Sequence, residues 1–493
     1  MLLSVLLFVS GCRKNVGALK KKNADSAAVT NEENQIVENT TVKLAADATD
    51  TLNPLLTSSY TLQRIMERVY EPLFAVDSEF NTFGVLAEDI TVSADGLSAD
   101  IKLKNGIVWH DNTAFGSNDV VYTIRNILDG MTSRTCTAIN AVSKVNSDTV
   151  RIYLNRPVIN IAAMLDFPIV KYATVMNPDM SYVPVGTGKY RYAGKISVDE
   201  HLFVPFEQYH GAIESENFDL TIVNNHDKLV QMFRAGETDA FFALENETVT
   251  AANGKVKIIN EPSDKMVYVG INYNNPIFWG QNTRQAVSAV INKQSIVSSI
   301  LFGHGAVADY AVNPSSYICD GLDMTASYSV DNAEELMKKD GWTMTSKGYY
   351  SRAVDGKNQD CIIRILTNEN ETFVKIADFI ENELTAFGIN CSVQMMPETE
   401  YEALINAGYY DLFIGEKSMG KNMDFYELAA FPNVFTYVNE NLEKSIKALS
   451  TENNISEKNM LYQRCLKILK EDTPFIPLYF KNTEIFYSEA FGE

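Results

Sequence analysis

The chain has 493 residues, enough for several domains, and its 46% hydrophobic content with 24 Tyr and 25 Phe is sufficient to build hydrophobic cores, which excludes disorder throughout. Lys and Arg total 42 against 63 Asp and Glu, so the net charge is −21. A surface of this sign repels phosphate backbones, and we therefore exclude nucleic acid as a partner.

The N-terminus reads as a targeting segment followed by a tether. Residues 1–12 are mostly apolar and end in Val9-Ser10-Gly11-Cys12, but this run is too short to span a bilayer. Residues 13–40 are polar and contain no aromatic residue, which is typical of a flexible linker. No later apolar run approaches spanning length, so we expect no other segment to enter a membrane.

The first elements of the body are a hairpin, a helix and a strand. Asp95-Gly96 is a good turn sequence and joins predicted strands at 90–92 and 101–103. Ser117 is placed to cap a helix over 119–128 that ends near Gly130, and residues 149–154 alternate as a strand.

A second region predicts alternating strands and helices. Asp331 to Glu334 has capping-box spacing and opens a helix that ends at Gly341. Strands are then expected at 362–366, 390–395 and 410–414, separated by helices at 371–387 and 400–407. This order predicts a parallel sheet, and such sheets bind ligands beyond the carboxyl ends of their strands, so the segment after Ile414 is a cleft candidate.

The cysteines and histidines predict no disulfide framework, metal site or cofactor. After Cys12 the cysteines form no C-x-x-C pair, and we expect buried free thiols, although Cys361 and Cys391 begin two predicted strands and could face one another. The five histidines have no metal-site spacing, Gly188-Lys189 lacks the rest of a phosphate-binding loop, and Ser418 lacks the first glycine of a nucleophile elbow. We therefore expect that the protein is not an enzyme.

Short motifs along the body together resemble a known family, the family 5 extracellular solute-binding proteins. These are the receptor lipoproteins of ABC importers for oligopeptides, dipeptides and, in one branch, nickel. The matching segments run in order from residue 52 to 477: Leu52-Asn53-Pro54, Val69 to Leu73, Leu86-Ala87-Glu88, Leu103 to Asp111, Asn118 to Tyr122, Val185 to Tyr190, Phe233 to Asp239, Gly270 to Tyr273, Thr283 to Ala286 and Pro474 to Pro477.

The resemblance implies an α/β fold of the periplasmic-binding-protein type, class II (cluster C). Two lobes built from three mixed α/β domains would enclose a ligand cleft. Domain I would comprise residues 41–70, 186–255 and 474–493, domain II residues 71–185, and domain III residues 256–473. Two crossing segments would form the hinge, and closure of domain III on domain I would bury the ligand.

The implied function is capture of di- to oligopeptides and their delivery to ABC permease subunits with cytoplasmic ATPases. Val9 to Cys12 resembles the lipobox of bacterial lipoproteins, although no Lys or Arg precedes it. This implies a signal peptide over 1–12 and lipidation at Cys12. The protein is then expected as a lipid-anchored monomer on the extracytoplasmic face of the plasma membrane.

The resemblance also places ligand-contacting residues, which are Ser58, Ser59, Tyr60, Thr135, Cys136, Gly415, Glu416 and Asp424. Many relatives carry Gly-Trp and closely spaced aspartates after the third strand, one of which pairs with the peptide α-amino group. Here the tryptophan is absent, so Asp424 or Glu416 would take that role.

Lys417 and Lys421 in the same stretch disfavour a cationic terminus. An acidic or non-peptide ligand, such as a nickel chelate or a sugar, therefore stays open. A signalling peptide that is sensed rather than imported is the other alternative.

Overall fold

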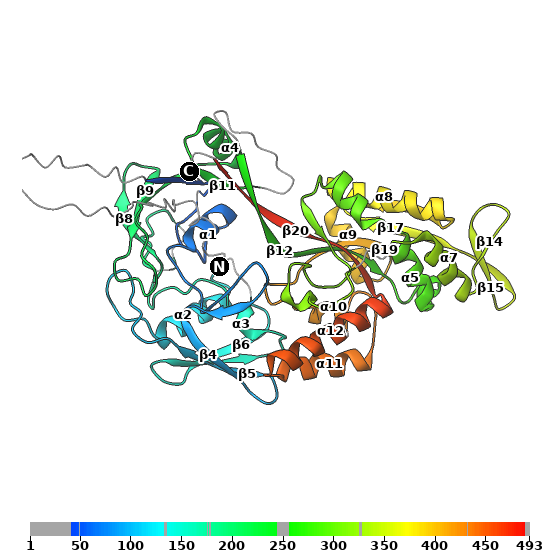
Figure 1. The fold of residues 1–493 in the computed structure, drawn as a ribbon, viewed down its shortest axis with the longest axis horizontal. Helices are drawn as coiled ribbons and strands as arrows, with labels where there is room; N and C mark the ends of the chain where they lie inside the picture. The colour runs from blue at the N-terminus through cyan, green and yellow to red at the C-terminus, as the bar shows by residue number, and fades with distance from the viewer. Residues whose placement is uncertain are drawn as a thin grey trace, which may run out of the picture.

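One long mixed sheet joins the two ends of the molecule. The computed structural model describes residues 41–48, 50–132, 136–174, 176, 179–243, 256–324, 328–430 and 432–488. Figure 1 shows two lobes, and two strands, β12 (Val256–Ile271) and β20 (Phe475–Ser488), run from one lobe into the other. The lobes are therefore linked by hydrogen-bonded strands.

The strands of this sheet come from distant parts of the chain. From edge to edge the order is β18 (Asn390–Met395), β17 (Ile362–Thr367), β19 (Leu412–Ser418), β12, β20, β11 (Ala240–Phe242), β1 (Val42–Ala46), β10 (Phe218–Ile222), β9 (Glu200–Pro205) and β8 (Tyr190–Lys195), with β13 (Gly305–Val307) beside β20.

The pairing of β12 with β20 is antiparallel and changes register part-way. Residues 256–262 pair with 482–488, and residues 266–270 pair with 475–480, with an irregularity between Pro262 and Met266. The side chains of 266–271 are all buried, whereas those of 256–265 are partly or fully exposed. A local break between two well-paired stretches is where the linking strands can bend most easily.

We call the lobe on the left of Figure 1, which contains α1 to α4, the first lobe, and the lobe on the right, with α5, α7 and α8, the second lobe. A separate four-stranded antiparallel sheet lies in the lower part of the first lobe in that view. Its order is β4 (Ala87–Val92), β5 (Ser98–Leu103), β7 (Thr149–Leu154) and β6 (Ile139–Lys144), and α2 (Ser117–Leu128) packs against it. Alternate residues of β5 and β7 are buried, as expected for a sheet with one covered face. The short strands β2 (Phe74–Val76) and β3 (Thr82–Gly84) and the helix α3 (Ile161–Met164) complete this unit.

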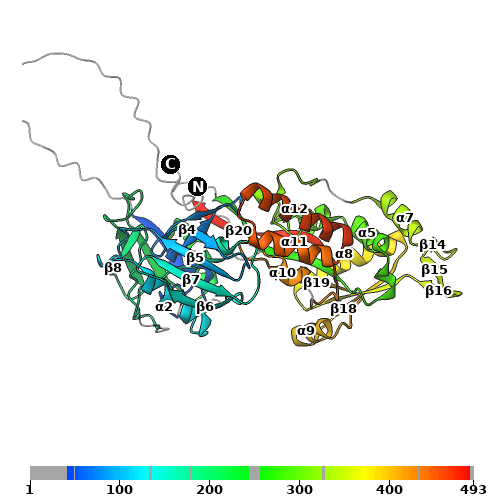
Figure 2. The same cartoon turned by 90° about the horizontal axis from the view of Figure 1, so that it is seen from below.

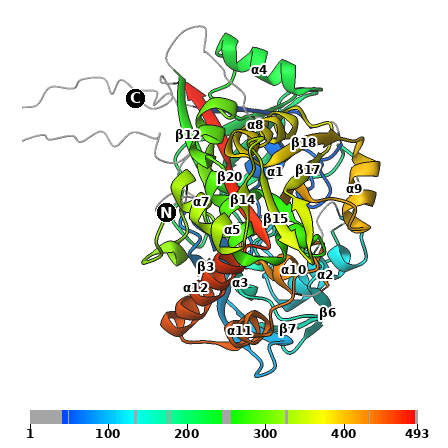
Figure 3. The ribbon, with the colours of Figure 1, turned by 90° about the vertical axis from the view of Figure 1, so that its right-hand side faces the viewer.

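The remaining helices mostly belong to the second lobe. Figures 2 and 3 show α11 and α12 side by side, and α8 lies along β17 and β18. The helices are α1 (Tyr60–Met66), α4 (His226–Ala235), η1 (Pro276–Trp279), α5 (Gln281–Val290), α6 (Lys293–Ser295), η2 (Ile296–Ile300), η3 (Tyr317–Cys319), α7 (Val330–Lys339), α8 (Glu371–Phe387), α9 (Glu398–Asn406), α10 (Tyr426–Ala429), α11 (Glu440–Thr451) and α12 (Ile455–Asp472). A small sheet contains β14 (Thr343–Met344), β15 (Tyr350–Val354) and β16 (Lys357–Asp360).

Most of the predicted elements are present. The strands at 149–154 and 390–395 and the helix at 371–387 are confirmed with the expected bounds, and the hairpin turns at Gly96 with φ of +72°. The strand expected at 362–366 extends to 367, and the helix expected at 400–407 spans 398–406.

Two helix caps and one strand were predicted wrongly. Helix α2 begins at Ser117 with Gly116 as its N-cap, and Asp119 accepts a hydrogen bond from the Gly116 amide at 2.8 Å. Helix α7 is capped by Ser329, two residues before the expected Asp331. Strand β19 was expected at 410–414 but starts at Leu412 and continues to Ser418. The parallel pairing expected of the three strands is confirmed, since β17 pairs in parallel with both β18 and β19. The whole sheet is nevertheless mixed, because β19 also pairs antiparallel with β12.

The cysteines outside the N-terminal segment are free thiols. Cys319, Cys361, Cys391 and Cys465 are buried and Cys136 is partly buried, so Cys361 and Cys391 form no disulfide. Among the described residues there is no cluster of three or more His, Cys, Asp or Glu side chains that could hold a metal ion. In the same part of the chain, no helix combines the length and apolar character needed to span a bilayer. The domain boundaries stay a prediction.

Gly186 and Gly188 lie where the chain passes back against the end of α1. The Gly188 amide donates to the Val69 carbonyl at 2.9 Å, and a Cβ added at Gly186 would lie 1.7 Å from that same oxygen. We expect Gly186→Ala to lower the free energy of unfolding by about 3 kcal/mol, because the backbone must move to relieve the overlap. Urea unfolding measures the loss.

Gly130→Ala is the matched control. Gly130 has φ of +68° but faces open space, so its substitution costs only the left-handed backbone conformation, about 1 kcal/mol. Equal losses for the two variants would contradict the steric explanation.

Candidate functional site

The stretch that the sequence singled out after Ile414 begins inside strand β19. Gly415 lies opposite Tyr268 of β12, and a Cβ at this position would come within 2.8 Å of the Tyr268 and Phe413 rings. Glu416 points away from that core and forms an ion pair with Lys481 of β20 at 2.6 Å. Both residues therefore lie against the strands that link the lobes.

Asp424 lies in the loop between β19 and α10, and its side chain is only 6% exposed. One carboxylate oxygen accepts the Tyr426 amide at 2.9 Å, and the other accepts from Nη1 of Arg156 at 2.7 Å. Arg156 follows β7, so this ion pair joins the four-stranded sheet unit to the second lobe. The Arg156 guanidinium also lies over the Tyr426 ring, 4.8 Å from its centroid.

A second ion pair crosses the same boundary. Nζ of Lys421 lies 3.2 Å from the Asp166 carboxylate, which follows α3. Burial lowers the pKa of Lys421, but Asp166 and Glu67 more than offset this, so the pKa is raised and the ammonium stays charged. We call the residues Arg156, Asp166, Lys421, Asp424 and Glu427 the lobe seam.

Glu427 completes the lobe seam on α10. It pairs with Lys417 of β19 and lies 3.9 Å from Nη2 of Arg156. The hydrogen bond from Lys417 lowers the pKa of Glu427, and the charges of Lys417 and Arg156 act in the same direction against partial burial.

Ser58, Ser59 and Tyr60 lie at the start of α1, and the two serines have structural hydrogen bonds. Ser59 is the N-cap, since its hydroxyl accepts the Leu62 amide, and it also donates to Asp47. Ser58 is exposed and donates from its amide and hydroxyl to Asp50.

Tyr60 is 44% exposed, and its ring packs edge-on against Phe242. One turn later, Arg64 of α1 binds Glu261 of β12 at 2.7 Å. The candidate residues Ser58, Ser59 and Tyr60 therefore lie at the start of a helix that contacts β12, one of the linking strands.

Cys136 lies near the lobe seam. Burial raises the pKa of its thiol to about 11, with Asp166 raising it and Arg156 lowering it by their charges. Thr135 and Cys12 lie outside the described residues.

The structure thus groups Cys136 with Asp424 around Arg156, and places Glu416 and Tyr60 at the linking strands. Sequence reasoning missed Arg156 and Asp166. The only local signals are that each follows a short element, which does not single out either residue.

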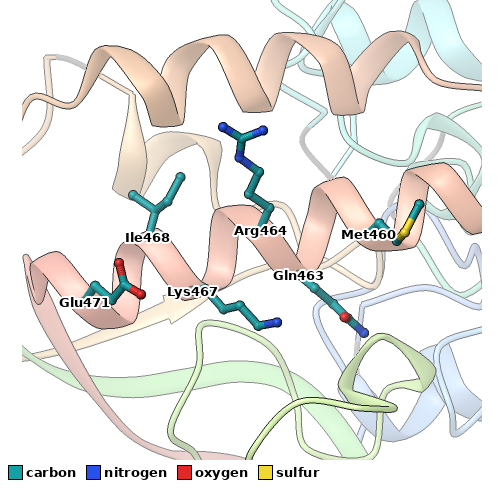
Figure 4. A pocket seen from close by; sticks show the side chains of 6 residues that line it. All are labelled: Met460, Gln463, Arg464, Lys467, Ile468 and Glu471. Atoms are coloured by element: carbon teal, nitrogen blue, oxygen red, sulfur yellow. The ribbon is translucent and has the colours of Figure 1, made fainter.

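A hollow on α12 does not share these residues. All six residues that line it come from α12, and Figure 4 shows Arg464 and Lys467 pointing away from one another. Its lining residues do not converge on one point, and none is a candidate from the sequence. The lobe seam is therefore the better candidate site.

Residues 82–435 match the profile described as bacterial extracellular solute-binding proteins, family 5. The chain belongs to this family. Its fold is therefore the class II two-lobe fold, as the sequence predicted, and its members are substrate-binding proteins of ABC importers rather than enzymes. The family's extracellular description agrees with an extracytoplasmic location.

Individual relatives are distant but cover nearly the whole chain. The glutathione-binding protein GsiB of Escherichia coli (strain K12) is 24% identical over 456 residues, which cover 87% of this chain and 86% of the relative. The oligopeptide-binding protein AppA from Bacillus subtilis, solved with a nonapeptide, has 21% identity and a TM-score of 0.58, with 91% and 94% of the two chains covered.

A nickel ABC transporter structure from Bacillus halodurans has 18% identity and a TM-score of 0.74, with 91% and 95% of the two chains covered. At these identities the two solved structures show the fold alone.

The lowered pKa of Glu427 predicts an acid-dependent stability. A carboxyl group whose pKa is lowered on folding stabilises the folded protein at pH values above its ordinary pKa of 4.5. This stabilisation is lost as the pH falls through the lowered pKa. Glu427→Gln should therefore be less stable than the parent near neutral pH, by about 0.5 kcal/mol because solvent screens the half-exposed pair, and equally stable once the pH is well below the lowered pKa. Chemical unfolding at a series of pH values measures the difference.

Glu334→Gln is the control, since Glu334 pairs with Lys338 at 3.7 Å on an exposed face of α7, beyond the first turn of that helix. Its difference from the parent should be near zero at every pH. A Glu427→Gln deficit that persists unchanged into acid would contradict the role of the ionised carboxylate.

Proposed function

We propose that this protein captures a peptide between its two lobes and delivers it to an ABC permease powered by cytoplasmic ATPases. The observation that carries the proposal is the lobe seam, where acids and bases from the two lobes pair with one another. A peptide brings an ammonium, a carboxylate and backbone hydrogen-bonding groups, and the seam offers partners of both signs. The relatives named for glutathione and for an oligopeptide support this ligand class.

The proposed contacts keep the residues expected from the sequence. Tyr60 and Ser58 are exposed at the start of α1 and are available to a ligand. Asp424 and Glu416 remain candidates for an α-amino group, although each is bound to a cation of the chain, so a ligand ammonium has to compete for them. Ser59, Gly415, Cys136 and Thr135 are proposed to shape the site rather than to carry charge.

We further propose that the protein acts as a monomer on the extracytoplasmic face of the plasma membrane, anchored by a lipid on Cys12. The lipobox-like Val9 to Cys12 supports the anchor. The polar residues 13–40 would then place the folded body at a distance from the bilayer.

A non-peptide or acidic ligand is the second candidate. Among the described residues of 415–427, the acids Glu416, Asp424 and Glu427 are each paired with Lys or Arg, which disfavours a purely cationic ligand. The nickel transporter among the structural neighbours is consistent with a metal chelate as cargo.

The ligand class is tested by native mass spectrometry of the chain without residues 1–12, followed by denaturation and sequencing of what co-purifies. We expect a mixture of short peptides of about two to seven residues, because backbone-directed binding accepts many sequences. A single non-peptide species or a metal complex would replace the peptide proposal with the second candidate. One peptide sequence alone would indicate a sensor for a signalling peptide.

Lipidation is tested by Cys12→Ser. We expect the parent to enter the detergent phase on phase separation and the variant to stay in the aqueous phase, because the thiol that would carry the lipid is lost. Cys136→Ser serves as the control and should partition like the parent. Detergent partitioning of Cys12→Ser at the level of the parent would contradict the anchor.

A further inference from the structure

The lobes contact each other at a second place, away from the strands that link them. The β4–β5 turn at Gly96 reaches the end of α11, where a Cβ on the glycine would lie 3.2 Å from Thr451. The Tyr317 amide of η3 donates to the carbonyl of Glu79 at 2.9 Å. The unit that contains β4–β7 is therefore held against the second lobe by contacts that a rotation about the linking strands would break.

Arg156 makes the strongest of these contacts. Its side chain is 20% exposed and its partner Asp424 is 6% exposed, so the ion pair is mostly removed from water. The Arg156 guanidinium contacts three groups of the second lobe: the Asp424 carboxylate, the face of the Tyr426 ring and, at longer range, Glu427. Separating the lobes would remove all three at once.

The contact has a second ion pair and an apolar part. Lys421 binds Asp166 at 3.2 Å, and Phe80 and Ile159 of the first lobe share a hydrophobic cluster with Met423, Phe425 and Tyr462 of the second. A cavity of about 20 Å³ is left at this contact, lined by Ile159, Lys421 and Met423 among others. This space is about the size of one water.

We propose that Arg156 and Lys421 form a two-point ionic latch that holds the lobes together through the chain's own side chains. A mostly buried ion pair stabilises one arrangement, because loss of one partner leaves the other charge buried and unpaired. The latched and open arrangements are then two populations of the chain, and substitution of a latch residue shifts the balance toward the open one. The latch goes beyond the proposed function, because the inference does not depend on the identity of the ligand.

Small-angle X-ray scattering of the protein without added ligand tests the latch. We expect Arg156→Met and Asp424→Asn each to increase the radius of gyration relative to the parent. The double variant should show no further increase, because both changes remove the same contact. Lys421→Met, at a side chain that is 43% exposed, should give a smaller increase in the same direction.

Arg151→Met is the matched control. Arg151 pairs with Asp100 at 2.5 Å between β7 and β5 of one sheet, so its loss should leave the radius of gyration unchanged. Circular dichroism confirms that each variant is folded. Salt is a poor substitute for the substitutions, because buried pairs are weakly screened.

The latch is overturned if the folded Arg156→Met, Asp424→Asn and Lys421→Met variants all keep the radius of gyration of the parent. It is also overturned if the parent itself scatters as an open molecule, with a curve that the latched arrangement does not fit. The scattering is measured after unfolding and refolding have removed any co-purified ligand, so the result does not depend on which ligand is captured. Failure of the latch and failure of the peptide proposal are therefore distinguishable.

Discussion

The pairing of β12 with β20 is the constraint on which the rest of the structure depends. Because these strands belong to the sheets of both lobes, the lobes can rotate but cannot separate. Register shifts between Pro262 and Met266 and between Val267 and Tyr268 interrupt the pairing, and Pro262 has no amide hydrogen to donate. The strands can bend most easily at these interruptions, and Glu416, which pairs with Lys481 of β20, lies beside them.

Local patterns were enough to predict the run of elements from β17 to β19 in the second lobe. Helix α8 has its bounds set by an Asn370 cap and by Gly388 in the left-handed conformation, and both signals lie within the segment itself. The start of α7 was wrong because Ser329 and Asp331 are both good caps, and only the packing of the finished helix decides between them. The length of β19 was also missed, since its partner β12 lies more than a hundred residues earlier in the chain.

Local sequence patterns predicted even less of the candidate site than of the fold. Asp424 could be singled out because acids are rare in its stretch, but the Arg156 that binds it is 268 residues away. No spacing rule connects two loops so far apart. Ser59 has a structural role that the sequence interpretation did not consider, since it is the N-cap of α1, while its contact with a ligand stays a prediction. The types of residue in the stretch made it a candidate site, whereas the ion pairs of its charged residues could be identified only from the fold.

The charged residues of the lobe seam pair with one another, and this limits which ligands can take the place of those ion pairs. Each acid of Asp166, Asp424 and Glu427 is matched by a base of the other lobe or of β19. A ligand of one sign that displaces one member of a mostly buried pair leaves the other member unpaired, which is costly. A zwitterion supplies both signs and can satisfy both members at once. The proposed peptide ligand meets this requirement through its two termini, and an acidic chelate meets it only if it also carries a donor for the displaced carboxylate.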